Sequence, residues 1–117
     1  MAALTVQPFT LTGVAVTTAA AAGGGDTFAN DATEKTFLYV NNGGGGGITV
    51  TITAQTTSIT TTGYGLVTIE DRTYSVGAGE AWYMGPFDKD AWNNSSGSVE
   101  VGYSGVTSVT VAAIRMS

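Results

Sequence analysis

The stretch ITVTITA, residues 48–54, indicates the fold most clearly, because apolar residues alternate with threonine along its whole length. The apolar residues at positions 48, 50, 52 and 54 fall on one face of an extended chain, and the threonines between them fall on the other. A period of two predicts a β-strand with one buried face and one face toward solvent or a partner.

Similar runs follow along the chain, with turn signals at intervals of about ten residues. They are TFLYVN (36–41), LVTIEDRTYSV (66–76), AWYMGPF (81–87), VEVGYS (99–104) and VTVAAIR (109–115). We expect no helix beyond a turn within residues 88–94, and a hairpin that joins 66–76 to 81–87 through GAGE. The pattern predicts an all-β fold, an antiparallel, jelly-roll-like β-sandwich of six to eight short strands.

The chain has 117 residues, which is the size of one domain, but its first 25 residues differ in composition from the rest. Loose alternation there ends in AAAAGGG, residues 19–25. We predict an N-terminal arm or first strand with a Gly/Ala-rich link over residues 1–25, and a β-sandwich domain over residues 26–117. An arm could pack on a neighbour or add a strand to it through its apolar residues, Leu4, Val6, Phe9 and Leu11.

The composition excludes several classes of function. Histidine and cysteine are absent, which excludes Ser-His-Asp and Cys-His catalysis and thiolate metal sites. The net charge is −5, and the four basic residues are far apart in the sequence, so we expect no nucleic-acid binding. The apolar stretch at 11–22 is too short to span a bilayer and lacks the basic start of a secretion signal, so we expect a soluble, non-secreted chain and no membrane partner.

Five consecutive glycines, Gly43–Gly47, are the most unusual local feature. A phosphate-binding loop would continue as Gly-Lys-Ser/Thr into a helix, whereas this run continues into the strand at 48–54. The run is therefore interpreted as a hairpin rim between 36–41 and 48–54. Because glycine has no side chain, such a rim can approach the backbone of a neighbour, with Gly43, Gly45 and Gly47 as candidate contacts.

The acidic residues offer weak candidates for chemistry. Asp88 and Asp90 carry oxygen ligands suited to calcium, but the further acidic ligands of an EF-hand loop are missing. Glu70, Asp71 and Glu80 are the candidates for a glycosidase pair, but adjacent residues 70 and 71 point to opposite faces of a strand. We therefore predict no catalytic residue, no metal site and no cofactor.

The aromatic residues Trp82, Tyr83 and Trp92 leave several interpretations open. Exposed rings on a sandwich bind sugars or anchor a protein partner. In the alternative, Trp82 shares a buried face with Met84, and Trp92 folds down as a lid on the core. Trp92 is a candidate interface residue on the first interpretation.

Four segments carry a resemblance to a known family: DTFANDATEKTFLYVNN (26–42), ITVTI (48–52), VGAGEAWYMGPF (76–87) and SVEVGYSGVTSVTVAAIR (98–115). Together they resemble small β-proteins of tailed bacteriophages and prophages that are regarded as capsid decoration or cement proteins. The resemblance implies a structural protein on the outer surface of the virion capsid, often a trimer, that bridges subunits of the major capsid protein. It implies no catalytic residue. Two alternatives stay open: a carbohydrate-binding module, and a minor neck or tail-associated protein of the same virion.

Overall fold

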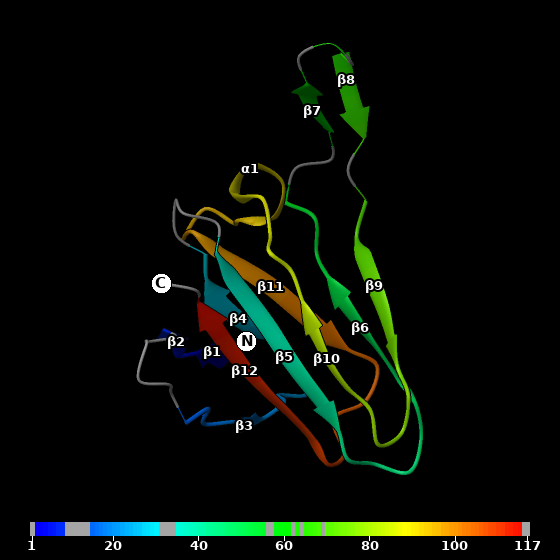
Figure 1. Ribbon diagram of the computed structural model, residues 1–117. Helices are drawn as coiled ribbons and strands as arrows, with labels where there is room; N and C mark the ends of the chain where they lie inside the picture. Colours follow the sequence, from blue (N-terminus) through cyan, green and yellow to red (C-terminus); the bar gives the residue numbers. More distant parts are fainter. Residues whose placement is uncertain are drawn as a thin grey trace.

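The protein forms a β-sandwich in the computed structural model (Figure 1). The structure describes residues 2–8, 15–30, 35–55, 58–61, 63, 65–68 and 70–115, without the side chains of 58–61, 65–68 and 90. Within this part of the chain, two five-stranded sheets pack together, and the single helix is one turn, α1 (Lys89–Trp92). The predicted β-sandwich is confirmed, as is the helical turn within 88–94.

The two sheets are built from strands that are distant in sequence. The first sheet has the order β1 (Ala2–Leu4), β4 (Asp26–Ala29), β11 (Ser98–Tyr103), β6 (Ile48–Ile52), β9 (Arg72–Val76). The second has the order β10 (Ala81–Met84), β5 (Thr36–Asn42), β12 (Val109–Arg115), β2 (Val6–Pro8), and β3 (Ala19–Ala20) also pairs with β12. The sheets are mixed, because β1 pairs with β4, and β2 with β12, in parallel.

The core lies between the sheets and follows the alternation seen in the sequence. On β6, Val50 and Ile52 have no exposed surface, whereas Thr49 on the opposite face is exposed and Thr51 is half-buried. Leu38 and Val40 of β5 face them from the second sheet and are equally buried. Burying a side chain of this size stabilises the fold by about 1.5–3 kcal/mol, so these alternating positions hold the two sheets together.

The chain passes from one sheet to the other at most of its connections, which makes the two predicted hairpins wrong. The glycine run joins β5 in the second sheet to β6 in the first, and residues 77–80 join β9 in the first sheet to β10 in the second. A short glycine-rich loop can connect strands within a sheet or across a sandwich. Local pattern shows that a strand has a buried face, but it does not show which sheet the strand joins.

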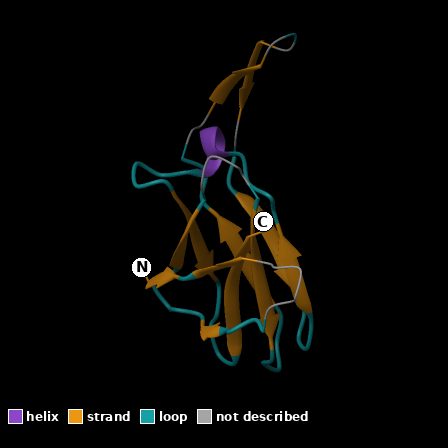
Figure 2. Ribbon diagram, turned by 60° about the vertical axis from the view of Figure 1, so that its left-hand side comes forward, coloured by secondary structure: helices purple, strands orange, loops and turns teal. Residues whose placement is uncertain are grey.

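A hairpin projects from one end of the sandwich (Figures 1 and 2). Its strands, β7 (Ser58–Thr61) and β8 (Gly65–Thr68), pair with each other in a separate two-stranded sheet. The predicted run at 66–76 is thus divided between β8 in the hairpin and β9 in the body. The Cα radius of gyration is 14.6 Å, against about 13 Å for a compact domain of this length, which fits a body with a projection.

The N-terminal residues belong to both sheets. β1 pairs with β4 at the edge of the first sheet, and β2 pairs with β12 in the second, so the chain crosses between the sheets at Thr5. Leu4 and Val6 are half-buried and pack against the core. In the isolated chain, residues 2–8 therefore close one side of their own sandwich.

Candidate interaction surfaces

A pair of tyrosines lies on the outer face of the second sheet. Tyr83 of β10 is directly opposite Tyr39 of β5, and their ring centroids are 5.0 Å apart at an interplanar angle of 49°. Tyr83 is 66% exposed. Burying an exposed ring contributes strongly to binding, and a tyrosine also offers a hydroxyl for hydrogen bonds. This tyrosine pair can therefore contact a protein or stack on a sugar.

Trp82 lies at the open edge of the sandwich. Its ring centroid is 6.3 Å from that of Tyr74 on β9, in an edge-on arrangement, so rings from the two sheets meet across this edge. The indole Nε1 donates to Glu80 Oε1 at 3.3 Å, and Trp82 is 37% exposed. Met84 on the same strand is buried, whereas Trp82 is partly exposed, so Trp82 is not a core residue as Met84 is. It covers the rim, because β10 is an edge strand.

Trp92 packs on the core. Its ring is 6.4 Å from that of Phe87, which in turn is 5.8 Å from that of Phe28. Trp92 is half-buried, while Phe28 and Phe87 are buried. Of the two interpretations of Trp92 from the sequence, its position fits the lid on the core, with part of the ring still accessible.

Asn42 fixes the conformation of the glycine run. It is fully buried, and its Nδ2 donates to the carbonyl oxygens of Gly46 at 2.9 Å and Val76 at 3.1 Å. Its Oδ1 accepts a hydrogen bond from the backbone N–H of Gly44 at 3.1 Å. The amide of one side chain thus bonds to the backbone at two points of the loop and at the end of β9, and it ties the loop to the body of the sandwich.

Two of the glycines are needed for close contacts within the chain itself. A Cβ on Gly43 or Gly44 would lie 3.0 or 2.9 Å from a backbone carbonyl oxygen of the turn at 107–108. A Cβ on Gly45 would meet nothing within 4 Å, and one on Gly47 would make ordinary contact at 3.6 Å. Of the three candidate contacts, Gly43 is thus occupied by its own chain, whereas Gly45 faces open space.

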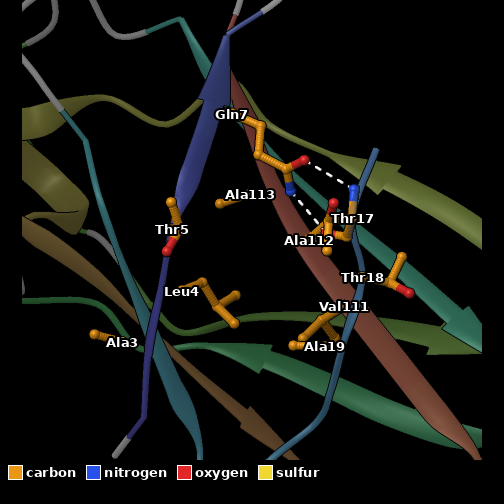
Figure 3. Close-up of a pocket in the computed structure, with 10 residues that line it drawn as sticks. All are labelled: Ala3, Leu4, Thr5, Gln7, Thr17, Thr18, Ala19, Val111, Ala112 and Ala113. Atoms are coloured by element: carbon orange, nitrogen blue, oxygen red, sulfur yellow. Dashed lines mark hydrogen bonds between the residues drawn. The ribbon is translucent and has the colours of Figure 1, made fainter. Parts of the chain in front are cut away.

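A cavity of about 400 Å³ lies beside the N-terminal strands (Figure 3). Its lining is uncharged and comes from three parts of the chain: Ala3, Leu4, Thr5 and Gln7 near the N-terminus, Thr17, Thr18 and Ala19, and Val111, Ala112 and Ala113 of β12. Gln7 holds Thr17 at its border: Gln7 Nε2 donates to the Thr17 carbonyl oxygen at 2.7 Å, and the Thr17 N–H donates to Gln7 Oε1 at 2.8 Å. Of the predicted arm residues, Leu4 lines the cavity and Val6 lies in the neighbouring strand β2. Phe9 and Leu11 are outside the described residues.

Asp26 and Tyr103 form a buried polar pair. The Tyr103 hydroxyl donates to Asp26 Oδ2 at 2.8 Å, and the Ala22 N–H donates to the same oxygen at 3.3 Å. Burial, and then the hydrogen bond to the carboxylate, raise the pKa of Tyr103 well above its usual value. The hydrogen bond ties Asp26 of β4 to Tyr103 of β11, and the Asp26 carboxylate is fully buried.

The exposed acidic residues make local structural contacts. Glu80 Oε1 accepts a hydrogen bond from the backbone N–H of Gly77 at 2.8 Å, and Asp71 Oδ1 accepts one from that of Ala54 at 2.9 Å. Within the described part of the chain, no three or more His, Cys, Asp or Glu side chains are grouped so that they could hold a metal ion. The side chain of Asp90, one of the calcium candidates, is outside the description.

The described residues thus make up a β-sandwich with a tyrosine pair on its outer face, a projecting hairpin and an N-terminal segment shared by both sheets. Among them, no helix has the length and apolar character needed to cross a bilayer. Comparisons with protein-family models, curated proteins and solved structures found no match to this chain. The resemblance to capsid decoration proteins therefore stays a prediction.

Three residues of these surfaces, Tyr39, Asn42 and Gln7, are not among the candidates that the sequence predicts. Tyr39 has a usable signal, because it occupies an outward position in the alternating run at 36–41. Asn42 and Gln7 have none, since their roles depend on backbone groups 34 and 10 residues away.

Proposed function

We propose that this chain is a structural virion protein that decorates the outer surface of a bacteriophage capsid and bridges subunits of the major capsid protein. The single observation that favours a bridging role is the β7–β8 hairpin, which extends away from the sandwich (Figure 2). The strand and turn patterns that resemble decoration proteins supply the rest of the argument.

The hairpin suits contact with a neighbour because of its geometry. A two-stranded hairpin alone is at best marginally stable in water, since it has no second layer against which to bury a face. β7 and β8 form their own sheet and do not pair with either sheet of the sandwich. Within the described residues, α1 lies next to β7 but belongs to no sheet. Packing against another protein would add a layer to the hairpin, and it would place the sandwich at a junction between two molecules.

The rest of the surface fits the same role. The tyrosine pair, of which Tyr83 is exposed and Tyr39 half-buried, provides apolar area for a second contact. The net charge of −5 suits the outside of a capsid better than its DNA-facing side. Contacts that are weak one by one suffice when they repeat over a closed shell, because many copies act together.

The test is co-sedimentation of the purified chain with capsids that lack it. A variant in which Asn-Gly replaces residues 57–69 should remain folded and lose most capsid binding. Its thermal unfolding is measured alongside, and Lys35→Ala, an exposed change in the body, serves as the control. Absence of binding by the unmodified chain would overturn the capsid role, and unchanged binding by the shortened variant would remove the hairpin from it. Stoichiometry with the capsid protein separates decoration from a neck or tail role.

A second candidate, carbohydrate binding, is favoured by the tyrosine pair. An exposed ring, Tyr83, beside the half-buried ring of Tyr39 on the face of a sheet can stack on the apolar face of a sugar ring. Glycan binding that Tyr83→Ala abolishes and Lys35→Ala preserves would support this function. Binding to capsids with no detectable affinity for glycans would exclude it.

The proposed role also includes self-association, with a trimer as the form that the resemblance implies. A trimer would place three hairpins around one axis, so that a single assembly reaches several capsid subunits. Light scattering of the purified chain measures this state directly.

A further inference from the structure

Two segments of the N-terminal region share one edge of β12. β3 pairs antiparallel with its first part, and β2 pairs parallel with its last part. The partners are Thr110 with Ala20 and Val111 with Ala19 for β3, and Ala113 with Val6, Ile114 with Gln7 and Arg115 with Pro8 for β2. Neither segment pairs with Ala112, and the cavity of Figure 3 lies at this junction.

The register of β3 predicts what its continuation would meet. In an antiparallel pair, each step back along β3 corresponds to one step forward along β12. Residues 18, 17, 16 and 15 would therefore lie opposite residues 112, 113, 114 and 115. These last three positions are the ones that β2 occupies. Residues 15–18 are described and exposed, and they belong to no strand; Val16, for example, is 39% exposed.

The hydrogen bonds of Thr17 fit the same continuation. The Ala21 N–H donates to the Val109 carbonyl oxygen at 3.0 Å, and hydrogen-bonded pairs recur at every second residue of an antiparallel ladder. Thr17 opposite Ala113 would accordingly be a hydrogen-bonded pair. At present the Gln7 side chain holds both backbone groups that Thr17 would use in that pair.

We infer that β2 (Val6–Pro8) and residues 15–18 are alternative occupants of the same edge of β12. When residues 2–8 leave, residues 15–18 extend β3 along β12 to Arg115. The extension would place Ala15 and Thr17 toward the sandwich, next to small neighbours such as Ala113, and would fill the cavity that now separates the two segments. The edge of β12 then stays covered in both arrangements.

The arrangement with β2 in place prevails in the isolated chain, because it buries Leu4 and Val6 against the core. Residues 2–8 would leave only when another protein buries those side chains. The identity of that other protein rests on the proposed function, under which it is a capsid subunit. The exchange of strands on β12 itself does not depend on that function.

The test uses disulfides in the full-length chain, which has no cysteine of its own. Directly paired residues have Cα atoms about 4.5–5.5 Å apart, a distance that a disulfide spans. Val6→Cys with Ala113→Cys reports the arrangement with β2 in place. Thr17→Cys with Ala113→Cys reports the alternative, because Ala113 can pair with one strand at a time on this edge. Ala15→Cys with Ala113→Cys is the register control, since diagonal neighbours lie about 7–8 Å apart.

Under a glutathione redox buffer, the 6/113 pair should oxidise almost completely and the 17/113 pair only in part. Adding Leu4→Asp, which penalises docking of residues 2–8, should raise the 17/113 product several-fold and leave the 15/113 control low. In the 17/113 product, the amides of residues 2–7 should lose protection from hydrogen exchange. A 17/113 yield no higher than that of the control, with or without Leu4→Asp, would overturn the inference.

Hydrogen exchange without any cysteine gives an independent check. In the Leu4→Asp chain, the amides of Ala15 and Thr17 should both be protected, because both belong to the extended ladder. Protection of Ala15 distinguishes that ladder from the present contact of Thr17 with Gln7. Fast exchange at Ala15 in a variant that still unfolds cooperatively would contradict the exchange of strands. An absence of capsid binding would leave both results unaffected.

Discussion

Asp26 is the residue whose burial most needs explanation, because it is an acidic group with no exposed surface. Its Oδ2 accepts hydrogen bonds from Tyr103 and from the Ala22 N–H, while its Oδ1 has no hydrogen-bond partner. We expect Tyr103→Phe to destabilise the fold by about 1–3 kcal/mol, because it removes one of the few donors to a buried oxygen. Urea unfolding measures the loss. Tyr39→Phe, a change of the same hydroxyl on the outer face, is the control and should cost much less.

The pair of Asp26 and Tyr103 also makes the stability of the fold depend on pH in the alkaline range. The folded chain raises the pKa of Tyr103 above the value of 10.0 that applies when it is unfolded. Its contribution to stability is therefore complete below about pH 10 and is lost as the pH rises further, because the unfolded chain releases a proton that the folded chain retains. Above pH 10, the free energy of unfolding should fall less steeply with pH in Tyr103→Phe than in the parent, by up to about 1.4 kcal/mol per pH unit. Equal slopes in the two proteins would refute this.

At the scale of elements, the sequence predicts strands well and their partners poorly. The alternation at 48–54 places Val50 and Ile52 in the core as expected. The loops after β5 and β9 were predicted as hairpins, but each crosses to the other sheet. The partner of a strand is decided by burial against residues far along the chain, and an isolated strand-loop-strand pattern contains no information about them.

For the candidate interaction surfaces too, the sequence predicts features of single segments but not the contacts between segments. The exposure of Tyr83 is one of the alternatives that the sequence leaves open, whereas its ring contact with Tyr39 depends on the pairing of β10 with β5. The glycine run could be recognised as unsuited to phosphate binding from its neighbours alone. Its attachment through Asn42 could not, since that contact needs the carbonyl of Val76 in the other sheet.

Single alanine substitutions can show which glycines the loop needs. Gly44→Ala should destabilise the fold, because its Cβ would lie 2.9 Å from the Thr107 carbonyl oxygen. Gly45→Ala should be neutral or stabilise by up to about 1 kcal/mol, because its site is open and alanine restricts the unfolded chain. Thermal unfolding of the two variants, which differ by one position, makes the comparison. Equal melting temperatures would show that the loop is not held against the 107–108 turn.

At the scale of the whole molecule, β5 and β10, which carry the tyrosine pair, lie in the body of the sandwich, and the hairpin projects from its end (Figure 1). If both contact the same capsid, they form two separate parts of one interface. Losses of binding free energy add for sites that share no partners. Tyr83→Ser and the hairpin-shortened variant should each weaken binding, and the double variant should show the sum of the two losses within about 0.5 kcal/mol.

Equilibrium binding of the four proteins to capsids that lack this chain measures that sum. The parent and the two single variants define the expected affinity of the double variant, and Lys35→Ala again controls for changes at the surface of the body. A double variant no weaker than the worse single one would mean that one feature acts only through the other. A loss confined to Tyr83→Ser would place the face of β5 and β10 in the interface and would remove the hairpin from it.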